Sequence, residues 1–163
     1  MNETGDDSEV RSISPCFVLK LNNIWGFKPE AFGKNYNDIE NNEVLPGDLM
    51  EHIDKLEKNG EDLEQVWIDC FGRNPADMEA LDGRLKYFPE SRGLPTEYFP
   101  FNGTATSSKH YHAPLVAVQL NSENITLGQV VEIQCHAFYK GVGHKYERSN
   151  DFKGMANFQV QFV

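Results

Sequence analysis

The chain of 163 residues has few cysteines, no long apolar run and no cluster of basic residues. Its 15 Lys and Arg residues are outnumbered by 25 Asp and Glu residues, which gives a formal net charge of −10. Nucleic-acid backbones and anionic lipid headgroups attract clustered positive charge, so the composition argues against both as partners. No stretch approaches the roughly 20 apolar residues that a membrane-spanning helix needs.

Residues 1–11 are polar and acidic, and they match neither a signal peptide nor a transit peptide. Cys16, Cys70 and Cys135 lie far apart, without a Cys/His cluster at zinc-ligand spacing, so a structural metal site is not indicated. Three N-glycosylation sequons are headed by Asn2, Asn102 and Asn124. Each is either a glycan acceptor or an ordinary surface asparagine.

Alternating apolar and polar residues predict β-strands, most clearly in the last third of the chain. Residues 131–139 and 158–162 alternate cleanly, whereas residues 115–120 are almost wholly apolar and predict an interior strand. Earlier strands are predicted at 16–21 and 66–70. In the second of these, Val66, Ile68 and Cys70 share one face and Trp67 takes the other.

Clusters of Gly, Pro and Asn at 72–75, 92–95 and 141–143 predict turns between these strands. Several short strands separated by such turns favour a mainly β, antiparallel sandwich. Leu49, Ile53 and Leu56 recur at helical spacing, which predicts one inserted helix at about 46–58. We therefore expect a flexible segment at 1–13 and a single domain at 14–163.

The cysteines leave two alternatives open. Cys70 and Cys135 lie on the apolar faces of predicted strands, where they are either a disulfide pair or two buried thiols. If they pair, Cys16 is left over, and we expect either an incomplete chain or a bond from Cys16 to another chain. An incomplete chain also accounts for the lack of a leader or membrane anchor.

Residues with catalytic or metal-binding potential are few. His110 and His112 flank Tyr111 and place two imidazoles on one predicted strand face, but a third ligand is not evident. We interpret them as surface residues and the acidic stretch 48–64 as a solvated helix face. No Ser/His/Asp order, nucleophile elbow or phosphate-binding glycine loop appears. A hydrolase that uses the two histidines is the enzymatic alternative.

Five ordered blocks resemble the β subunits of sodium/potassium-transporting P-type ATPases, and the ordered resemblance runs from about Ser14 to the C-terminus, some nine-tenths of the chain. They are Ser14–Pro29 (SPCFVLKLNNIWGFKP), Cys70–Asp77 (CFGRNPAD), Tyr98–Gly103 (YFPFNG), Pro114–Gln119 (PLVAVQ) and Ile133–Phe138 (IQCHAF). The acidic helix and the second block are more similar to invertebrate members than to vertebrate ones. The resemblance implies an immunoglobulin-like ectodomain on the outer face of the plasma membrane.

Members of that family carry a cytoplasmic tail and one transmembrane helix before this region, so the resemblance covers a C-terminal portion only. It implies a bridge between Cys70 and Cys135, an upstream partner for Cys16, and a glycan on Asn124. It also implies a non-catalytic subunit without cofactor or metal, which helps the catalytic α subunit to fold, reach the cell surface and bind potassium.

The α-facing residues implied by the resemblance are Tyr98, Phe99, Phe101 and Gly103. Asn102 departs from the family pattern, because an aromatic residue is usual there, and a glycan on Asn102 would crowd the same surface. The alternative to a pump subunit is a β-sandwich module for cell adhesion or recognition, acting through homophilic or glycan-mediated contacts.

Overall fold

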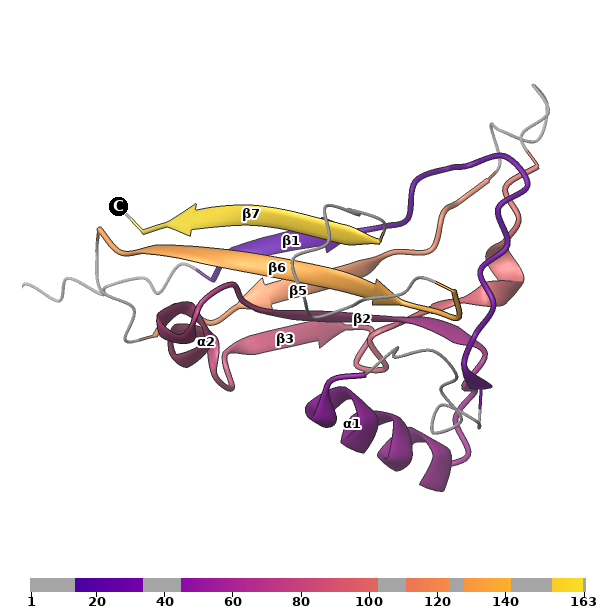
Figure 1. Cartoon of the computed structure of the whole chain (residues 1–163), viewed down its shortest axis with the longest axis horizontal. Coiled ribbons are helices and arrows are strands. Elements are labelled where there is room, and N and C mark those ends of the chain that lie inside the picture. Colours follow the sequence, from indigo (N-terminus) through magenta and orange to yellow (C-terminus); the bar gives the residue numbers. More distant parts are fainter. Residues whose placement is uncertain (1–13, 34–44, 103–110, 124–127, 142–153, 163) are drawn as a thin grey trace, which may run out of the picture.

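The computed structural model describes residues 14–33, 45–102, 111–123, 128–141 and 154–162, in which seven strands form two antiparallel sheets. The three-stranded sheet has the order β1 (Cys16–Leu19), β5 (Val116–Leu120) and β3 (Leu85–Phe88). The four-stranded sheet has the order β4 (Gly93–Pro95), β2 (Gln65–Gly72), β6 (Val130–Phe138) and β7 (Met155–Gln161). The predicted mainly β sandwich is confirmed (Figure 1).

The main core lies between the two sheets and follows from the period of two along each strand. In β5, Val116, Val118 and Leu120 are fully buried, and the residues between them are half-buried. β5 is the middle strand of its sheet, so the prediction of an interior strand at 115–120 is confirmed. In β6, Val131 and Ile133 turn inward to meet the same cluster.

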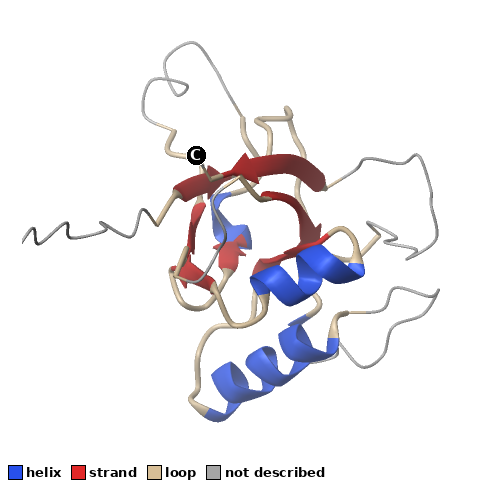
Figure 2. Ribbon diagram, turned by 90° about the vertical axis from the view of Figure 1, so that its left-hand side faces the viewer, coloured by secondary structure: helices blue, strands red, loops and turns tan. Residues whose placement is uncertain are grey.

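Strand β2 is buried on both faces. Val66 and Ile68 enter the main core, whereas Trp67 enters a second cluster formed with helix α1 (Gly47–Lys58). Leu49 and Ile53 of α1 are fully buried in that cluster, as their helical spacing predicts. Figure 2 shows α1 as a separate layer outside the sheets, which confirms the predicted inserted helix.

Several short elements were not predicted from the sequence. Helix α2 (Pro75–Leu81) begins after Asn74, whose side-chain oxygen accepts a hydrogen bond of 3.0 Å from the Asp77 amide. The cluster at 92–95, predicted to be a turn, instead contains β4, which pairs with the start of β2. A 3₁₀ helix, η2 (Thr96–Tyr98), follows β4 directly.

A disulfide joins Cys70 to Cys135, which face each other in the register of β2 and β6. The bridge therefore lies within the four-stranded sheet and does not connect the two layers. Cys16 begins the edge strand β1 and is exposed, without a bridge to the described residues. Residues 1–13, for which a flexible segment was predicted, lie outside the described ranges.

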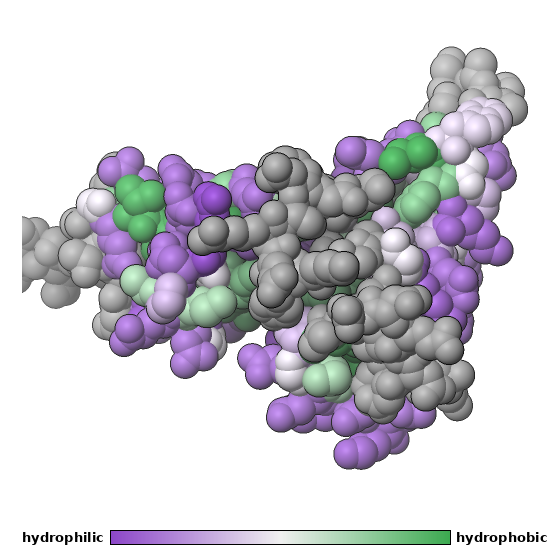
Figure 3. Space-filling model, viewed as in Figure 1, coloured by the Kyte–Doolittle hydropathy of each residue, from purple (hydrophilic) through white to green (hydrophobic). Residues whose placement is uncertain are grey.

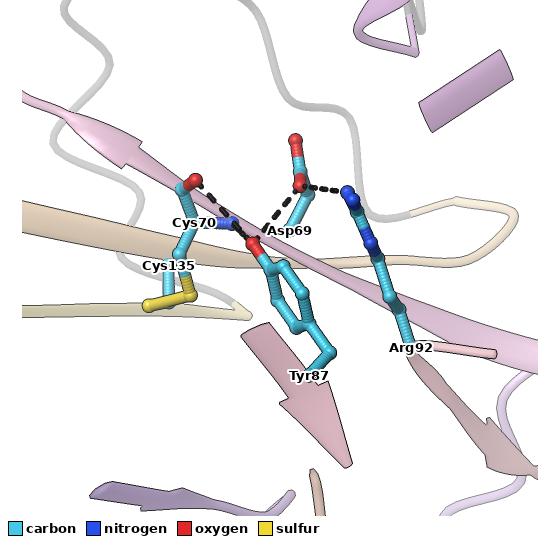
Figure 4. Close-up of a disulfide and its surroundings, with 5 residues drawn as sticks. All are labelled: Asp69, Cys70, Tyr87, Arg92 and Cys135. Atoms are coloured by element: carbon cyan, nitrogen blue, oxygen red, sulfur yellow. Dashed lines mark hydrogen bonds and ion pairs between the residues drawn. A yellow bond between two sulfur atoms is a disulfide. The ribbon is translucent and has the colours of Figure 1, made fainter. Parts of the chain in front are cut away.

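A buried polar cluster stands beside the disulfide (Figure 4). The Tyr87 hydroxyl accepts a hydrogen bond of 3.0 Å from the Cys70 amide and donates one of 3.3 Å to Asp69 Oδ1. The same carboxylate oxygen lies 3.0 Å from Arg92 Nη1, and the Arg92 guanidinium sits 4.3 Å from the centre of the Tyr87 ring. One arginine thus ties the end of β3 to the middle of β2.

Burial controls the titration of this cluster. It raises the pKa of the Asp69 carboxyl above the ordinary value of 3.8, while Arg92 and the Tyr87 hydrogen bond act in the opposite direction. Burial also raises the pKa of the Tyr87 hydroxyl, and the neighbouring Asp69 charge adds to that shift. On α1, burial and then the charge of Arg92 lower the pKa of His52 below 6.5. Tyr87 and His52 are consequently uncharged at neutral pH.

Candidate partner-binding surface

Two segments far apart in the sequence meet at one end of the sandwich. Trp25, in the segment that follows β1, forms a parallel bridge with Phe101, which lies beyond η2. The Gly26 amide donates a hydrogen bond of 3.1 Å to the Phe101 carbonyl. Gly26 has a φ of 67°, a left-handed conformation that a glycine adopts without strain. In Figure 1 the two segments run together at the right-hand end of the molecule.

Phe99 anchors this end to the sandwich. Its side chain is only 8% exposed, and its ring packs edge-on against Phe27 at 6.3 Å between centroids. Phe27 in turn packs against Tyr139, just beyond β6, at 5.7 Å. The expectation that Phe99 faces a partner therefore does not fit its position, because the ring is turned into the protein to hold the two segments in place.

The outward side chains of the two segments are large and apolar. Trp25 is 65% exposed, Ile24 is 57% exposed, and Tyr98, the last residue of η2, is 49% exposed. Phe101 is half-buried, with its ring against Tyr111 at 4.9 Å. We call these four residues, Ile24, Trp25, Tyr98 and Phe101, the aromatic surface. Figure 3 shows apolar side chains gathered at this end.

A cleft of about 510 Å³ adjoins the aromatic surface. It lies between the segment that follows β1 and the neighbouring ends of β6 and β7, with Ile68 among its lining residues. Ile24 belongs to both features, and Phe27 lines the cleft as well. The aromatic surface and the cleft therefore adjoin each other at Ile24.

The remaining predicted site residues fall in different places. Asn102 is exposed and directly follows Phe101. His112 is exposed in the irregular segment before β5, and among the described residues no group of His, Cys, Asp and Glu side chains is arranged to hold a metal ion. The residues that lie outside the described ranges are Asn2, Gly103, His110 and Asn124.

Sequence reasoning missed Ile24 and Trp25 as surface residues. They stand within a quoted block, but the alternation rule gives them no strand position, and their contact with Phe101 is long-range. The available signal was a tryptophan placed between two asparagines and Gly26, in a stretch without strand alternation. A large aromatic side chain outside the predicted core is a candidate interface residue.

A family model described as "Sodium / potassium ATPase beta chain" matches residues 7–158. The chain belongs to this family. Two of the blocks that carry the family resemblance, 14–29 and 98–103, supply the two halves of the aromatic surface. The surface is thus built from segments by which this β chain resembles its family.

Individual relatives give the same assignment. The chain is 37% identical to the sodium/potassium-transporting ATPase subunit beta-1 of Drosophila melanogaster over 90% of its own length and 42% of the relative's. It is 35% identical to the beta-2 subunit of the same organism, over 80% of this chain and 38% of the relative. A beta-233 subunit of Anguilla anguilla is 27% identical over 90% of this chain and 41% of the relative. This β chain therefore spans about two-fifths of the length of these three relatives.

The described part of this β chain contains two α-helices, α1 and α2. Neither is long and apolar enough to cross a lipid bilayer.

Proposed function

We propose that this chain is the partner-binding portion of a sodium/potassium pump β subunit, and that it docks on the catalytic α subunit through the aromatic surface. In this role it assists α-subunit folding, delivery to the plasma membrane and potassium binding, from the extracellular side. The chain itself contributes no catalytic group to ATP hydrolysis. The observation that carries the proposal is the Trp25–Phe101 bridge, which assembles an exposed apolar surface from two family-matching segments.

Large apolar side chains such as these are costly to leave in water. Burial of apolar area stabilises association, and Trp and Tyr are enriched among the residues that dominate interface energies. Phe99 and Phe27 fix the backbone beneath the surface, so little ordering is needed when a partner binds. Trp25 and Tyr98 are therefore the expected anchors, while Phe101 supports Trp25 through the backbone.

Substitution of the anchors tests the proposal. We expect Trp25→Ala and Tyr98→Ala each to weaken binding to the α subunit by about tenfold or more, because each removes a large side chain from the centre of the contact. The measurement is co-purification and titration of the chain against the detergent-solubilised α subunit. Phe88→Ala is the matched control, since Phe88 is as exposed as Tyr98, at 50% against 49%, but lies on β3, outside the aromatic surface. Equal losses for the control and the anchors would contradict the assignment.

A second candidate function, homophilic adhesion, is favoured by a different surface. On the outer face of the three-stranded sheet, Val18, Ala117 and Phe88 stand side by side in the registers of β1–β5 and β3–β5. Val18 and Phe88 are both exposed, so this row is an apolar strip suited to a second copy of the chain. If Phe88→Ala abolishes self-association in sedimentation while Trp25→Ala preserves it, adhesion takes precedence over pump docking.

A further inference from the structure

A glycosylation sequon stands at the edge of the aromatic surface. Asn102, Gly103 and Thr104 satisfy the Asn-x-Thr rule, and the Asn102 side chain is exposed. Asn102 directly follows Phe101, whose carbonyl accepts the Gly26 hydrogen bond and whose backbone pairs with Trp25. The acceptor amide is therefore one residue away from the point where the two segments of the surface meet.

A glycan attached there competes with a protein partner for the same area. An N-linked glycan is bulky and strongly hydrated, whereas protein docking requires the aromatic surface to be stripped of water. The apolar face of a sugar ring also packs well on an exposed aromatic ring, and Trp25, the bridge partner of the neighbouring Phe101, offers such a ring. A sugar and a protein partner would each cover the exposed aromatic area, and only one of them fits over it at a time.

We propose that Asn102 carries an N-linked glycan that shields the aromatic surface, so that the glycosylated form and the α-bound form exclude each other. The exclusion rests on the proposed function, because it needs the α subunit to bind at this surface. The shielding of Trp25 does not rest on it, and is measured without any partner. Glycan occupancy at Asn102 then sets the fraction of chains available for assembly.

The sequon allows variants that change the glycan while every residue of the aromatic surface keeps its identity. Thr104→Ala removes the sequon, and Thr104→Ser keeps it, while Asn102 stays in place in both. The full chain is expressed through the secretory pathway, and occupancy is read by peptide mass spectrometry. We expect a glycan on Asn102 in the wild type and in Thr104→Ser. A bare Asn102 in the secreted wild type overturns the proposal at this first step.

Tryptophan fluorescence measures the shielding. The chain has two tryptophans, and Trp67 is fully buried, so quenching by acrylamide reports on Trp25. We expect acrylamide to quench the glycosylated wild type and Thr104→Ser much less than it quenches Thr104→Ala. Quenching of Thr104→Ala should match that of an enzymatically deglycosylated wild type. Asn124→Gln, which removes a different sequon, serves as the control and should leave quenching unchanged. Equal quenching with and without the Asn102 glycan overturns the shielding.

Binding to the α subunit measures the exclusion. We expect Thr104→Ala to bind about tenfold or more tightly than the glycosylated Thr104→Ser. If both bind equally well, the exclusion is wrong while the docking function stands. If neither binds, the docking function is wrong and the exclusion falls with it, whereas the shielding is still decided by the quenching. The two failures are thus distinguishable.

Discussion

Replacing Cys70 and Cys135 together with alanine is expected to lower the free energy of unfolding by about 4 kcal/mol. The bridge links residues 65 positions apart, and the bond mainly restricts the unfolded chain. The native strands do not need it for alignment, because β2 and β6 are paired from Trp67 and Phe138 to Gly72 and Ile133. Domains of this kind are stable by only about 5 to 15 kcal/mol, so the loss is large.

Urea denaturation followed by circular dichroism measures this effect. We expect the midpoint to fall and the slope with urea to rise, because the unfolded chain without the bridge exposes more surface. Cys16→Ala is the control, since Cys16 is exposed and unbridged among the described residues, and its cost should be within about 0.5 kcal/mol. A double variant that unfolds at the wild-type midpoint would contradict a stabilising bridge.

The elements that could be predicted from the sequence are those in which the pattern of apolar residues follows from which residues are buried. β6 and β7 alternate because one face of each meets the core, and α1 shows Leu49 and Ile53 at helical spacing for the same reason. β5 was predicted from a nearly unbroken apolar run, as expected for the middle strand of its sheet. β3 has four residues, of which Tyr87 alone is buried, so its pattern is too short to detect. β4 begins at Gly93, which lies so close to the Gln65 side chain that a Cβ atom would not fit. In the sequence, a glycine needed for this close approach looks the same as a glycine needed for a turn, so β4 was predicted to be a turn.

The site was half predictable for a similar reason. Tyr98 and Phe101 were found through the family blocks, because a resemblance marks residues whatever their contacts are. Trp25 was missed because its place depends on a bridge to a segment far along the chain, and local patterns do not record such pairings. Phe99 was expected at the surface because the family resemblance placed it among the α-facing residues, and its burial depends on Phe27, another distant partner.

Replacing Arg92 with alanine is expected to lower the free energy of unfolding by about 3 kcal/mol, because it leaves the buried Asp69 carboxylate without its cation. Asp69 keeps the Tyr87 hydrogen bond, but the contact of the guanidinium with the Tyr87 ring is lost as well. Arg73→Ala is the matched control: its ion pair with Glu132 is solvent-exposed, and its loss should cost about 0 to 1 kcal/mol. Equal costs at the two arginines would contradict the role of burial.

The pH dependence separates the lost ion pair from lost packing. Because burial raises the pKa of Asp69 in the folded state, the folded carboxyl keeps its proton to a higher pH than the unfolded one, and stability falls as pH rises through that pKa. Removing the Arg92 charge raises this pKa further, so the deficit of Arg92→Ala is expected to be full at neutral pH and to shrink on acidification. His52 changes the deficit in the same direction. Without Arg92 the lowered pKa of His52 returns toward 6.5, so protonation of His52 at acidic pH opposes folding less than it does in the wild type.

Unfolding measured from about pH 8 to about pH 4 tests this expectation, with the Asp69→Asn background as the second arm. In that background the carboxylate is absent, and Arg92→Ala should cost much less and lose most of its pH dependence. The part that remains belongs to His52 and to the contact with the Tyr87 ring. A deficit that is constant with pH and unchanged by Asp69→Asn would show that Arg92 acts by packing alone, and that the carboxylate beside the disulfide does not need its cation.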